Sequence, residues 1–280
     1  MENTLLKKPK ITLTTTVNNR YPEILTDEAL KFLTVLHEKF NTKRLQLLNN
    51  RIDQQKLFDK GEFPEFPKET KDIRDSEWVA NTIPHDMQDR RVEITGPIER
   101  KMIINALNSG AKTFMADLED SNAPTWENTI QGQQNLIDAN KKTISLIDLK
   151  RDKSYKLNPE TAVLLVRPRG LHLNERHLTV NNEETSGSLV DFGLYVFHNT
   201  KTLMSNNTAP YFYLPKLEHY TEARWWNEVF AFAQDYLNVA KGTFKATVLI
   251  ETITASFQLD EIIYELKDHI VGLNCGRWDY

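Results

Sequence analysis

Charged side chains follow several short apolar runs in this chain, each where the run ends. The runs are 113-TFMADLED, 161-TAVLLVRPRG, 211-YFYLPK, 246-ATVLIET and 270-IVGLNCGRWDY. Parallel strands that are buried on both faces have this continuous apolar character, and chemistry in such folds gathers at the carboxyl ends of the strands. Four carboxylates and two cations at such ends predict a site for a hard metal ion and a small anionic substrate. These residues are Asp117, Glu119, Arg167, Lys216, Glu251 and Asp279.

The four carboxylates divide into two pairs. Side chains alternate along a strand, so Asp117 and Glu119 share a face and would repel one another unless a cation lies between them. Glu251 and Asp279 end consecutive strands, and neighbouring strands lie about 4.8 Å apart. Both could therefore hold one Mg²⁺, which prefers oxygen ligands. The alternatives are a solvated turn or helix cap for the first pair and N-cap or salt-bridge acids for the second.

Arg167 is the leading candidate for binding a substrate oxyanion or carboxylate, because its planar guanidinium offers a fork of donors. Arg169 competes for this role if the strand stays regular through Pro168, and the alternative for Arg167 is an ion pair with a neighbouring acid. Lys216 is the weaker cation, since a lysine that follows a proline is commonly solvated. The segment 276-GRWD adds backbone N–H groups that could hold an anion if a helix begins there.

Alternating strands and helices position these residues. Helices are expected at 97–110, 221–237 and 254–268. The alternation indicates parallel βα units, and the absence of a G-x-G-x-x-G or Walker loop favours a TIM barrel over a Rossmann fold. The predicted fold class is therefore α/β, with six of the eight strands of a TIM barrel. The expected strands are 90–95, 113–117, 162–167, 211–215, 246–251 and 271–275.

The N-terminal part is expected to be helical. A helix should begin near Thr26 as N-cap and carry an apolar stripe that continues to Ile52, and a short second helix is expected at 75–81. We place residues 1–85 in an N-terminal helical module and residues 86–280 in the partial barrel. Because the chain stops directly after a strand, we expect it to be the front part of a longer protein.

Composition bounds the class of function. With 40% apolar and 26% charged residues the chain is an ordinary soluble protein, and its net charge of -4 gives no reason to expect a nucleic-acid partner. No apolar run approaches the roughly 20 residues that span a membrane. The single cysteine excludes an intrachain disulfide and a cysteine-based zinc site, and a reducing, cytoplasmic compartment is the simplest interpretation.

Seven segments, in this order, resemble malate synthase, and the similarity is closest to the A-type form of the glyoxylate bypass. The resemblance runs from about residue 60 to the last residue. It implies condensation of acetyl-CoA with glyoxylate and water to malate and CoA, on a TIM barrel with an N-terminal helical clasp and a C-terminal helical plug. The segments are 90-RRVEITGP, 115-MADLEDSNAPTWEN, 164-LLVRPRGLHLNERH, 188-SLVDFGLYVFHN, 211-YFYLPK, 249-LIET and 271-VGLNCGRWDY.

The resemblance also implies a role for each candidate residue. Arg167 would be the catalytic arginine, which stabilises the acetyl enolate and the glyoxylate oxygens. Glu251 and Asp279 would ligate Mg²⁺, with Asp117 and Glu119 in an outer shell through bound water. The family's general base is an aspartate in a C-terminal part outside these residues, so the 280-residue piece alone is expected to be inactive or poorly folded. The backbone amides that would hold the glyoxylate carboxylate are those of Gly276, Arg277, Trp278 and Asp279.

Two other interpretations stay open. A related magnesium-dependent lyase that cleaves malyl-CoA or citryl-CoA shares the barrel, the metal and a MADLED-like strand, although GLNCGRWDY argues against it. A non-catalytic, truncated CoA-binding protein is the second, and a stop codon soon after Tyr280 would favour it. The resemblance leaves the oligomeric state open, and a eukaryotic source would make the peroxisome or glyoxysome the expected compartment.

Overall fold

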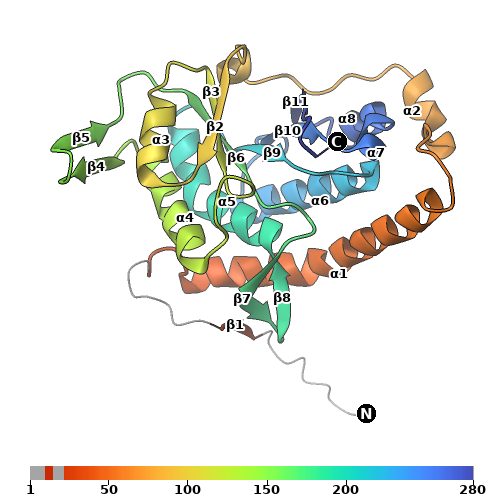
Figure 1. Cartoon of the computed structure of the whole chain (residues 1–280), viewed down its shortest axis with the longest axis horizontal. Helices are drawn as coiled ribbons and strands as arrows, with labels where there is room; N and C mark the ends of the chain where they lie inside the picture. The colour runs from red at the N-terminus through yellow and green to blue at the C-terminus, as the bar shows by residue number, and fades with distance from the viewer. Residues whose placement is uncertain (1–9, 15–21, 280) are drawn as a thin grey trace.

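The computed structural model describes residues 10–14 and 22–279. Its centre is a six-stranded sheet in the order β11-β10-β9-β6-β3-β2, in which all neighbouring strands are parallel (Figure 1). Within the described residues the sheet is open, with β2 and β11 at its edges. The predicted α/β class and the six strands of a partial TIM barrel are therefore confirmed. The strands are β2 (Glu93–Pro97), β3 (Thr113–Asp117), β6 (Val163–Arg167), β9 (Tyr211–Leu214), β10 (Lys245–Ile250) and β11 (Ile270–Cys275).

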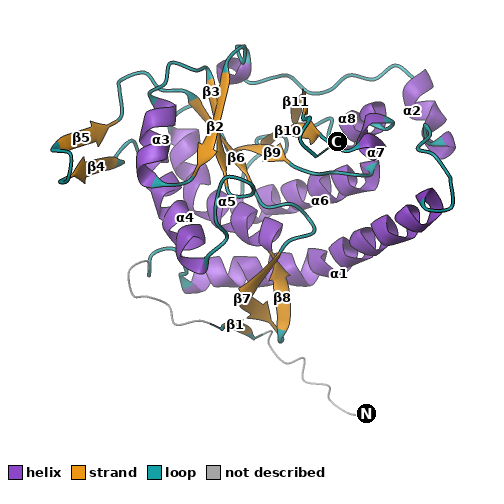
Figure 2. Cartoon of the chain, viewed as in Figure 1, coloured by secondary structure: helices purple, strands orange, loops and turns teal. Residues whose placement is uncertain are grey.

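Helices connect consecutive strands, as the alternation predicts (Figure 2). The helix expected at 221–237 is confirmed, but the one expected at 254–268 is broken into two short helices. The helix expected from Pro97 begins later, because Pro97 still belongs to β2 and Glu99 is the N-cap. These connecting helices are α3 (Arg100–Leu107), α4 (Trp126–Asn140), α5 (Gly187–Ser205), α6 (Tyr220–Leu237), α7 (Ile253–Ser256) and α8 (Leu259–Glu265).

Alternation along the strands separates two cores. Outward-facing residues such as Phe114 and Val166 pack with the helices in the main hydrophobic core. Because side chains alternate, Asp117 and Arg167 lie on the same face as the smaller inner cluster, one step beyond its apolar residues. That cluster contains Met87, Met115, Leu165, Tyr211, Tyr213, Leu249 and Val271. The carboxyl ends of the strands therefore place a polar site directly above an apolar floor.

The N-terminal helix α1 (Asp27–Phe58) lies against α5 and α6 (Figure 1). Thr26 is its N-cap, as expected, and the Thr26 hydroxyl accepts the N–H of Ala29 at 3.2 Å. The expected apolar stripe fails at Ile52, which is 56% exposed, because near that end α1 contacts α6 through Arg51 instead. None of the described helices is long and apolar enough to cross a membrane.

The chain between α1 and the barrel carries only short helices. The helix expected at 75–81 is wrong in position, since α2 covers Lys71–Asp75 and ends where the expected helix begins. Two single-turn 3₁₀ helices, η1 (Lys68–Thr70) and η2 (His85–Met87), flank this region.

Two small antiparallel sheets were not predicted. One consists of β1 (Ile11–Leu13), β7 (Asn174–Val180) and β8 (Glu183–Ser186), and the other of β4 (Ser145–Asp148) and β5 (Lys153–Lys156). Because β1 pairs with β7, the N-terminal residues join the barrel part through a shared sheet as well as through α1. The boundary at residue 85 stays a prediction.

Candidate active site

Arg167 and Asp117 form the centre of the site. They are register partners on β6 and β3, and Nε and Nη2 of Arg167 donate to Oδ1 and Oδ2 of Asp117, each at 2.7 Å. Asp117 also accepts the N–H groups of Glu119 at 2.8 Å and Ser121 at 2.7 Å, so both of its oxygens accept two hydrogen bonds. Asp117 therefore fixes the plane of the guanidinium and leaves Nη1 of Arg167 as the donor that it does not engage.

The pair is charged at all ordinary pH values. Burial alone would raise the pKa of Asp117, but hydrogen bonds and charge from Arg167 outweigh it and hold that pKa below its usual value. Burial alone would lower the pKa of Arg167, but the hydrogen bonds and negative charge of Asp117, with the nearby Glu119 and Asp120, raise that pKa above its usual value. Arg167 is thus a buried, permanent cation at the mouth of the barrel, in an ion pair that occupies two of its three donor groups.

Lys216 joins the ends of four strands, contrary to the expectation of a solvated side chain. Its Nζ lies 3.2 Å from Oε2 of Glu119, 3.0 Å from Oδ2 of Asp120 and 3.7 Å from Oδ2 of Asp279. Its backbone N–H donates to Oε1 of Glu251 at 2.7 Å. Burial lowers the pKa of Lys216, but the surrounding carboxylates raise it above its ordinary value. Its position at a strand end was the signal in the sequence that it belongs to the site.

Asp120 is a site residue that the sequence analysis missed. It is half-exposed, and its Oδ2 lies 3.3 Å from Nη2 of Arg167 and 3.0 Å from Nζ of Lys216. Alternation along β3 predicted that only Asp117 and Glu119 would share the inner face. The chain turns after β3, and side chains in a turn no longer alternate.

Glu251 and Asp279 lie together, as their strand-end positions predict. Burial raises the pKa of Glu251, and the nearby Asp279 carboxylate raises it further. The backbone N–H and the ammonium of Lys216 act to lower this pKa, but they do not outweigh the first two effects. A Cβ on Gly276 would lie 2.7 Å from Cβ of Glu251 and 3.2 Å from its Oε2. The chain can pass Glu251 this closely only because residue 276 is glycine.

The segment 276–279 differs from the expected anion cradle. No helix begins at Gly276 within the described residues, and the Gly276 N–H donates to the carbonyl of Ile250 at 2.9 Å, so this amide extends the strand ladder. Arg277 and Trp278 are exposed, with the guanidinium 4.9 Å from the centre of the indole ring. Any amides that bind an anion here are therefore those beyond Gly276.

The chemistry of the donor set fits a hard cation. The described residues contain no preformed cluster of three or more His, Cys, Asp or Glu side chains around a metal position. Lys216 provides the local positive charge among the acids instead. Burial and the neighbouring Asp279 carboxylate favour a proton on Glu251, and a divalent cation could replace that proton. All of these donors are carboxylate oxygens, which Mg²⁺ prefers.

Family models match both parts of the chain. The malate synthase N-terminal domain matches residues 10–72, and the malate synthase TIM barrel domain matches residues 163–280. The chain belongs to the malate synthase family. Malate synthase from Dictyostelium discoideum is 56% identical over 266 residues, covering 94% of this chain and 49% of that protein. Malate synthase A from Escherichia coli is 55% identical over 258 residues, covering 92% and 48% respectively.

The chain spans about half the length of the malate synthases it matches. The matched TIM barrel domain contains Arg167, Lys216, Glu251 and Asp279, while Asp117 lies between the two matched segments. The resemblance seen in the sequence is thereby confirmed at the level of the family.

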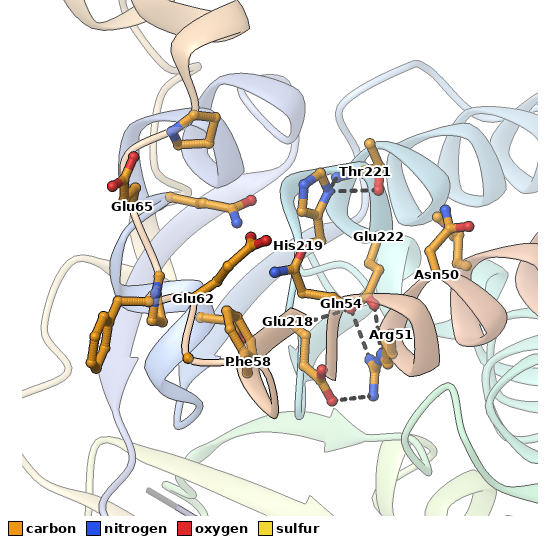
Figure 3. Close-up of a pocket in the computed structure, with 17 residues that line it drawn as sticks. Asn50, Arg51, Gln54, Phe58, Glu62, Glu65, Glu218, His219, Thr221 and Glu222 are labelled. Atoms are coloured by element: carbon orange, nitrogen blue, oxygen red, sulfur yellow. Dashed lines mark hydrogen bonds and ion pairs between the residues drawn. The ribbon is translucent and has the colours of Figure 1, made fainter. Parts of the chain in front are cut away.

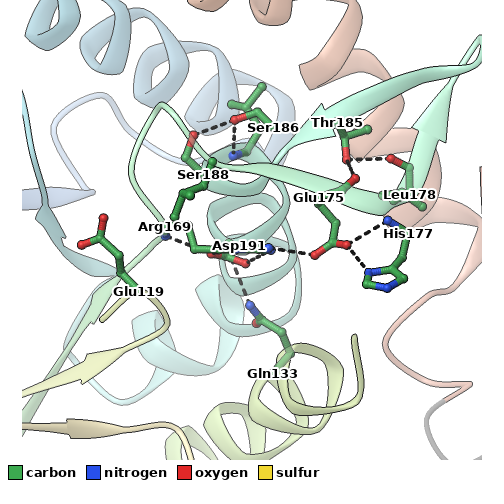
Figure 4. Close-up of polar contacts among 12 residues, drawn as sticks. Glu119, Gln133, Arg169, Glu175, His177, Leu178, Thr185, Ser186, Ser188 and Asp191 are labelled. Carbon is green, nitrogen blue, oxygen red and sulfur yellow. Dashed lines mark hydrogen bonds and ion pairs between the residues drawn. The ribbon is translucent and has the colours of Figure 1, made fainter. Parts of the chain in front are cut away.

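Arg169 does not compete with Arg167 in this malate synthase family member. It is buried, and its Nε and Nη2 donate to Asp191 of α5 at 2.9 and 2.8 Å while its Nη1 donates to Glu175 of β7 at 2.8 Å (Figure 4). The strand does not stay regular through Pro168, since β6 ends at Arg167. Arg169 therefore joins the loop after β6 to α5 and β7.

We predict that Arg169→Met destabilises the fold. The change leaves Asp191 and Glu175 buried without their cation, which costs about 3–5 kcal/mol. The free energy of unfolding in urea measures it. Arg151→Met is the control, because Arg151 is exposed and lies 4.0 Å from Asp148, and its effect should stay within about 0.5 kcal/mol. A loss below about 1 kcal/mol for Arg169→Met would contradict the structural role.

Glu119 should make the metal-free protein less stable as the pH rises. Burial raises the pKa of Glu119 from 4.5 to about 7, although Lys216 and Arg167 oppose this. The folded state then binds a proton more tightly than the unfolded state, so this contribution to stability is lost as the pH rises from about 4.5 through 7. In the presence of a chelator, Glu119→Gln should flatten the decline between pH 5 and 8 by roughly 1–3 kcal/mol. Thermal unfolding across this range measures it, and unchanged slopes would contradict it.

Proposed function

We propose that the protein is a malate synthase, which condenses acetyl-CoA with glyoxylate and water to give malate and CoA. The main support is that Lys216 connects Arg167 with Glu251 and Asp279 at the strand ends of the barrel in a chain of this family. Lys216 and Arg167 both contact Asp120, and Lys216 also contacts Glu251 and Asp279. Since the chain spans about half the length of its relatives, the activity is proposed for the full-length protein. We propose that these 280 residues alone are inactive, because the general base is expected outside them.

Arg167 is proposed as the catalytic arginine. Its guanidinium binds the oxygen of the acetyl group and the oxygens of glyoxylate, and stabilises the negative charge that develops on them. Asp117 holds the guanidinium through Nε and Nη2, so Nη1 meets the substrate with little reorganisation. Both oxygens of Asp117 are already engaged, which favours this orienting role over contact with a metal-bound water.

Glu251 and Asp279 are proposed to hold Mg²⁺, with Glu119 beside them in an outer shell. When bound, the cation supplies Lewis-acid polarisation of the substrate oxygens. Lys216 keeps the carboxylates at this edge, through its N–H to Glu251 and its ammonium near Asp279. The amides of Arg277, Trp278 and Asp279 are proposed to bind the glyoxylate carboxylate, and Gly276 allows the close approach to Glu251.

The proposed compartment is the cytoplasm, or the peroxisome or glyoxysome in a eukaryote. One relative is named glyoxysomal malate synthase, from Glycine max, and is 52% identical over 263 residues. Another, malate synthase A, comes from the bacterium Escherichia coli. The proposed partners are acetyl-CoA and glyoxylate, with neither nucleic acid nor a membrane.

The test is thiol release from acetyl-CoA by the full-length protein, with and without glyoxylate and Mg²⁺. Release that requires both supports the synthase. Release without glyoxylate indicates a thioesterase, and cleavage of malyl-CoA without condensation indicates the related lyase. No reaction and no binding of acetyl-CoA would contradict the proposal.

A further inference from the structure

Arg51, near the C-terminal end of α1, reaches across to the loop that follows β9. Its Nε and Nη2 donate to the two carboxylate oxygens of Glu222 at 2.7 and 2.8 Å, and its Nη1 donates to Glu218 at 2.9 Å (Figure 3). Nη2 also donates to the backbone carbonyl of Lys216 at 2.9 Å. The side chains of Arg51 and Glu222 are 14% and 1% exposed, so water screens the bonds between these two residues little.

Lys216 needs such support because its backbone is strained. Its φ is 52°, in the left-handed region that a residue with a β-carbon rarely adopts. A conformation of this kind persists only where surrounding contacts determine it. The same residue sends its N–H to Glu251 and its ammonium toward Glu119 and Asp279. Its backbone conformation therefore decides whether both groups point into the site.

Arg51 differs in this respect from Arg74, which also connects the N-terminal part to the barrel. Arg74 pairs with the buried Glu261 of α8 and donates to the carbonyl of Pro67 at 2.6 Å. It therefore ties the N-terminal part to the barrel by the same chemistry as Arg51. None of its described partners is a site residue, so Arg74 separates a tethering effect from an effect on the site.

We propose that Arg51 is a positioning residue of the active site. It holds Lys216 in the left-handed conformation, and thereby keeps the Lys216 N–H on Glu251 at the cation site. Helix α1 then does more than clasp the barrel, because it sets the affinity of the site for a divalent cation. This inference rests on the magnesium site proposed above and adds a residue from the N-terminal domain to it.

The test compares divalent-cation binding by full-length variants, with Mn²⁺ as the probe and free Mn²⁺ followed by electron paramagnetic resonance. Arg51→Met should raise the Kd at least tenfold. Arg74→Met, the matched control, should change it less than twofold even where it lowers the Tm as much. In steady-state kinetics Arg51→Met should raise the Mg²⁺ concentration needed for half-maximal rate while kcat at saturating Mg²⁺ falls less than threefold.

If Arg51→Met does not fold, Arg51→Lys tests the same proposal by its Kd for Mn²⁺. A lysine can pair with Glu222 but cannot bond Lys216, Glu218 and Glu222 together, so its Kd should rise three- to tenfold. A Kd within twofold of wild type for a folded Arg51 variant would overturn the proposal, as would an equal rise in Arg74→Met. If the wild-type protein itself binds no Mn²⁺ and makes no malate, the proposed function fails, which is a different outcome.

Discussion

Arg167→Lys should lower the turnover number of the full-length protein by about 10²–10³-fold, the usual cost of losing one preorganised charge-stabilising donor. A lysine keeps the charge, but one ammonium cannot both pair with Asp117 and reach the substrate. The guanidinium can do both, because Asp117 accepts from Nε and Nη2 and leaves Nη1 for the substrate. Steady-state kinetics at saturating acetyl-CoA, glyoxylate and Mg²⁺ measure the effect.

Arg169→Lys is the matched control for this prediction. It makes the same chemical change two residues away in a buried arginine whose partners are Asp191 and Glu175. We expect Arg169→Lys to lower the Tm while the folded enzyme keeps its turnover number within about threefold. We expect Arg167→Lys to lower the turnover number while the Tm changes less than in Arg169→Lys. If Arg167→Lys retains turnover, its assignment as the catalytic arginine is wrong.

Glu251→Gln should weaken binding of Mg²⁺ by at least about 100-fold, since even the loss of a supporting group around a metal costs 10–100-fold. The substitution keeps the size of the side chain and an oxygen that can accept the Lys216 N–H, so the loop after β9 should stay in place. Malate formation at low Mg²⁺ should fall steeply and recover in part as Mg²⁺ is raised. Titration calorimetry with Mg²⁺ measures the affinity directly.

Glu265→Gln provides the comparison for Glu251→Gln. Glu265 pairs with the half-exposed Arg224 between α8 and α6, away from the strand ends, and the same change of carboxylate to amide there should leave Mg²⁺ affinity unaltered. Equal Mg²⁺ affinity in wild type and Glu251→Gln would remove Glu251 from the metal site. Asp279 would then be the ligand to examine next.

Both predictions concern residues that local pattern placed at strand ends, and in the structure Arg167 ends β6 and Glu251 directly follows β10. Six strands were expected, five of them from apolar runs, and all six form one parallel sheet in chain order. The pattern was less successful for α5, which no periodicity predicted. Every residue from Gly187 to Val196 is buried, so this part of the helix lacks the polar face that makes an amphipathic helix visible in a sequence.

The two arginines differ in a way that only tertiary contacts explain. Arg167 and Arg169 are two positions apart, and the sequence offered both for one role. Asp117, 50 residues before Arg167, holds Arg167 in the site. Asp191, 22 residues after Arg169, binds Arg169 away from the site. Such contacts depend on how distant segments pack, which no local spacing encodes.

The sequence by itself determined which residues end the strands of this chain, and therefore that carboxylates and an arginine meet at one edge of a barrel. It could do so because burial on both faces leaves a continuous apolar run, and parallel strands bring their carboxyl ends to the same side. The sequence offered Lys216 as the weaker cation of this site, and only the tertiary structure decided that its ammonium contacts Glu119, Asp120 and Asp279. The link of Lys216 to Arg51, 165 residues earlier, arises because α1 packs against the loop after β9, and no local spacing encodes that contact.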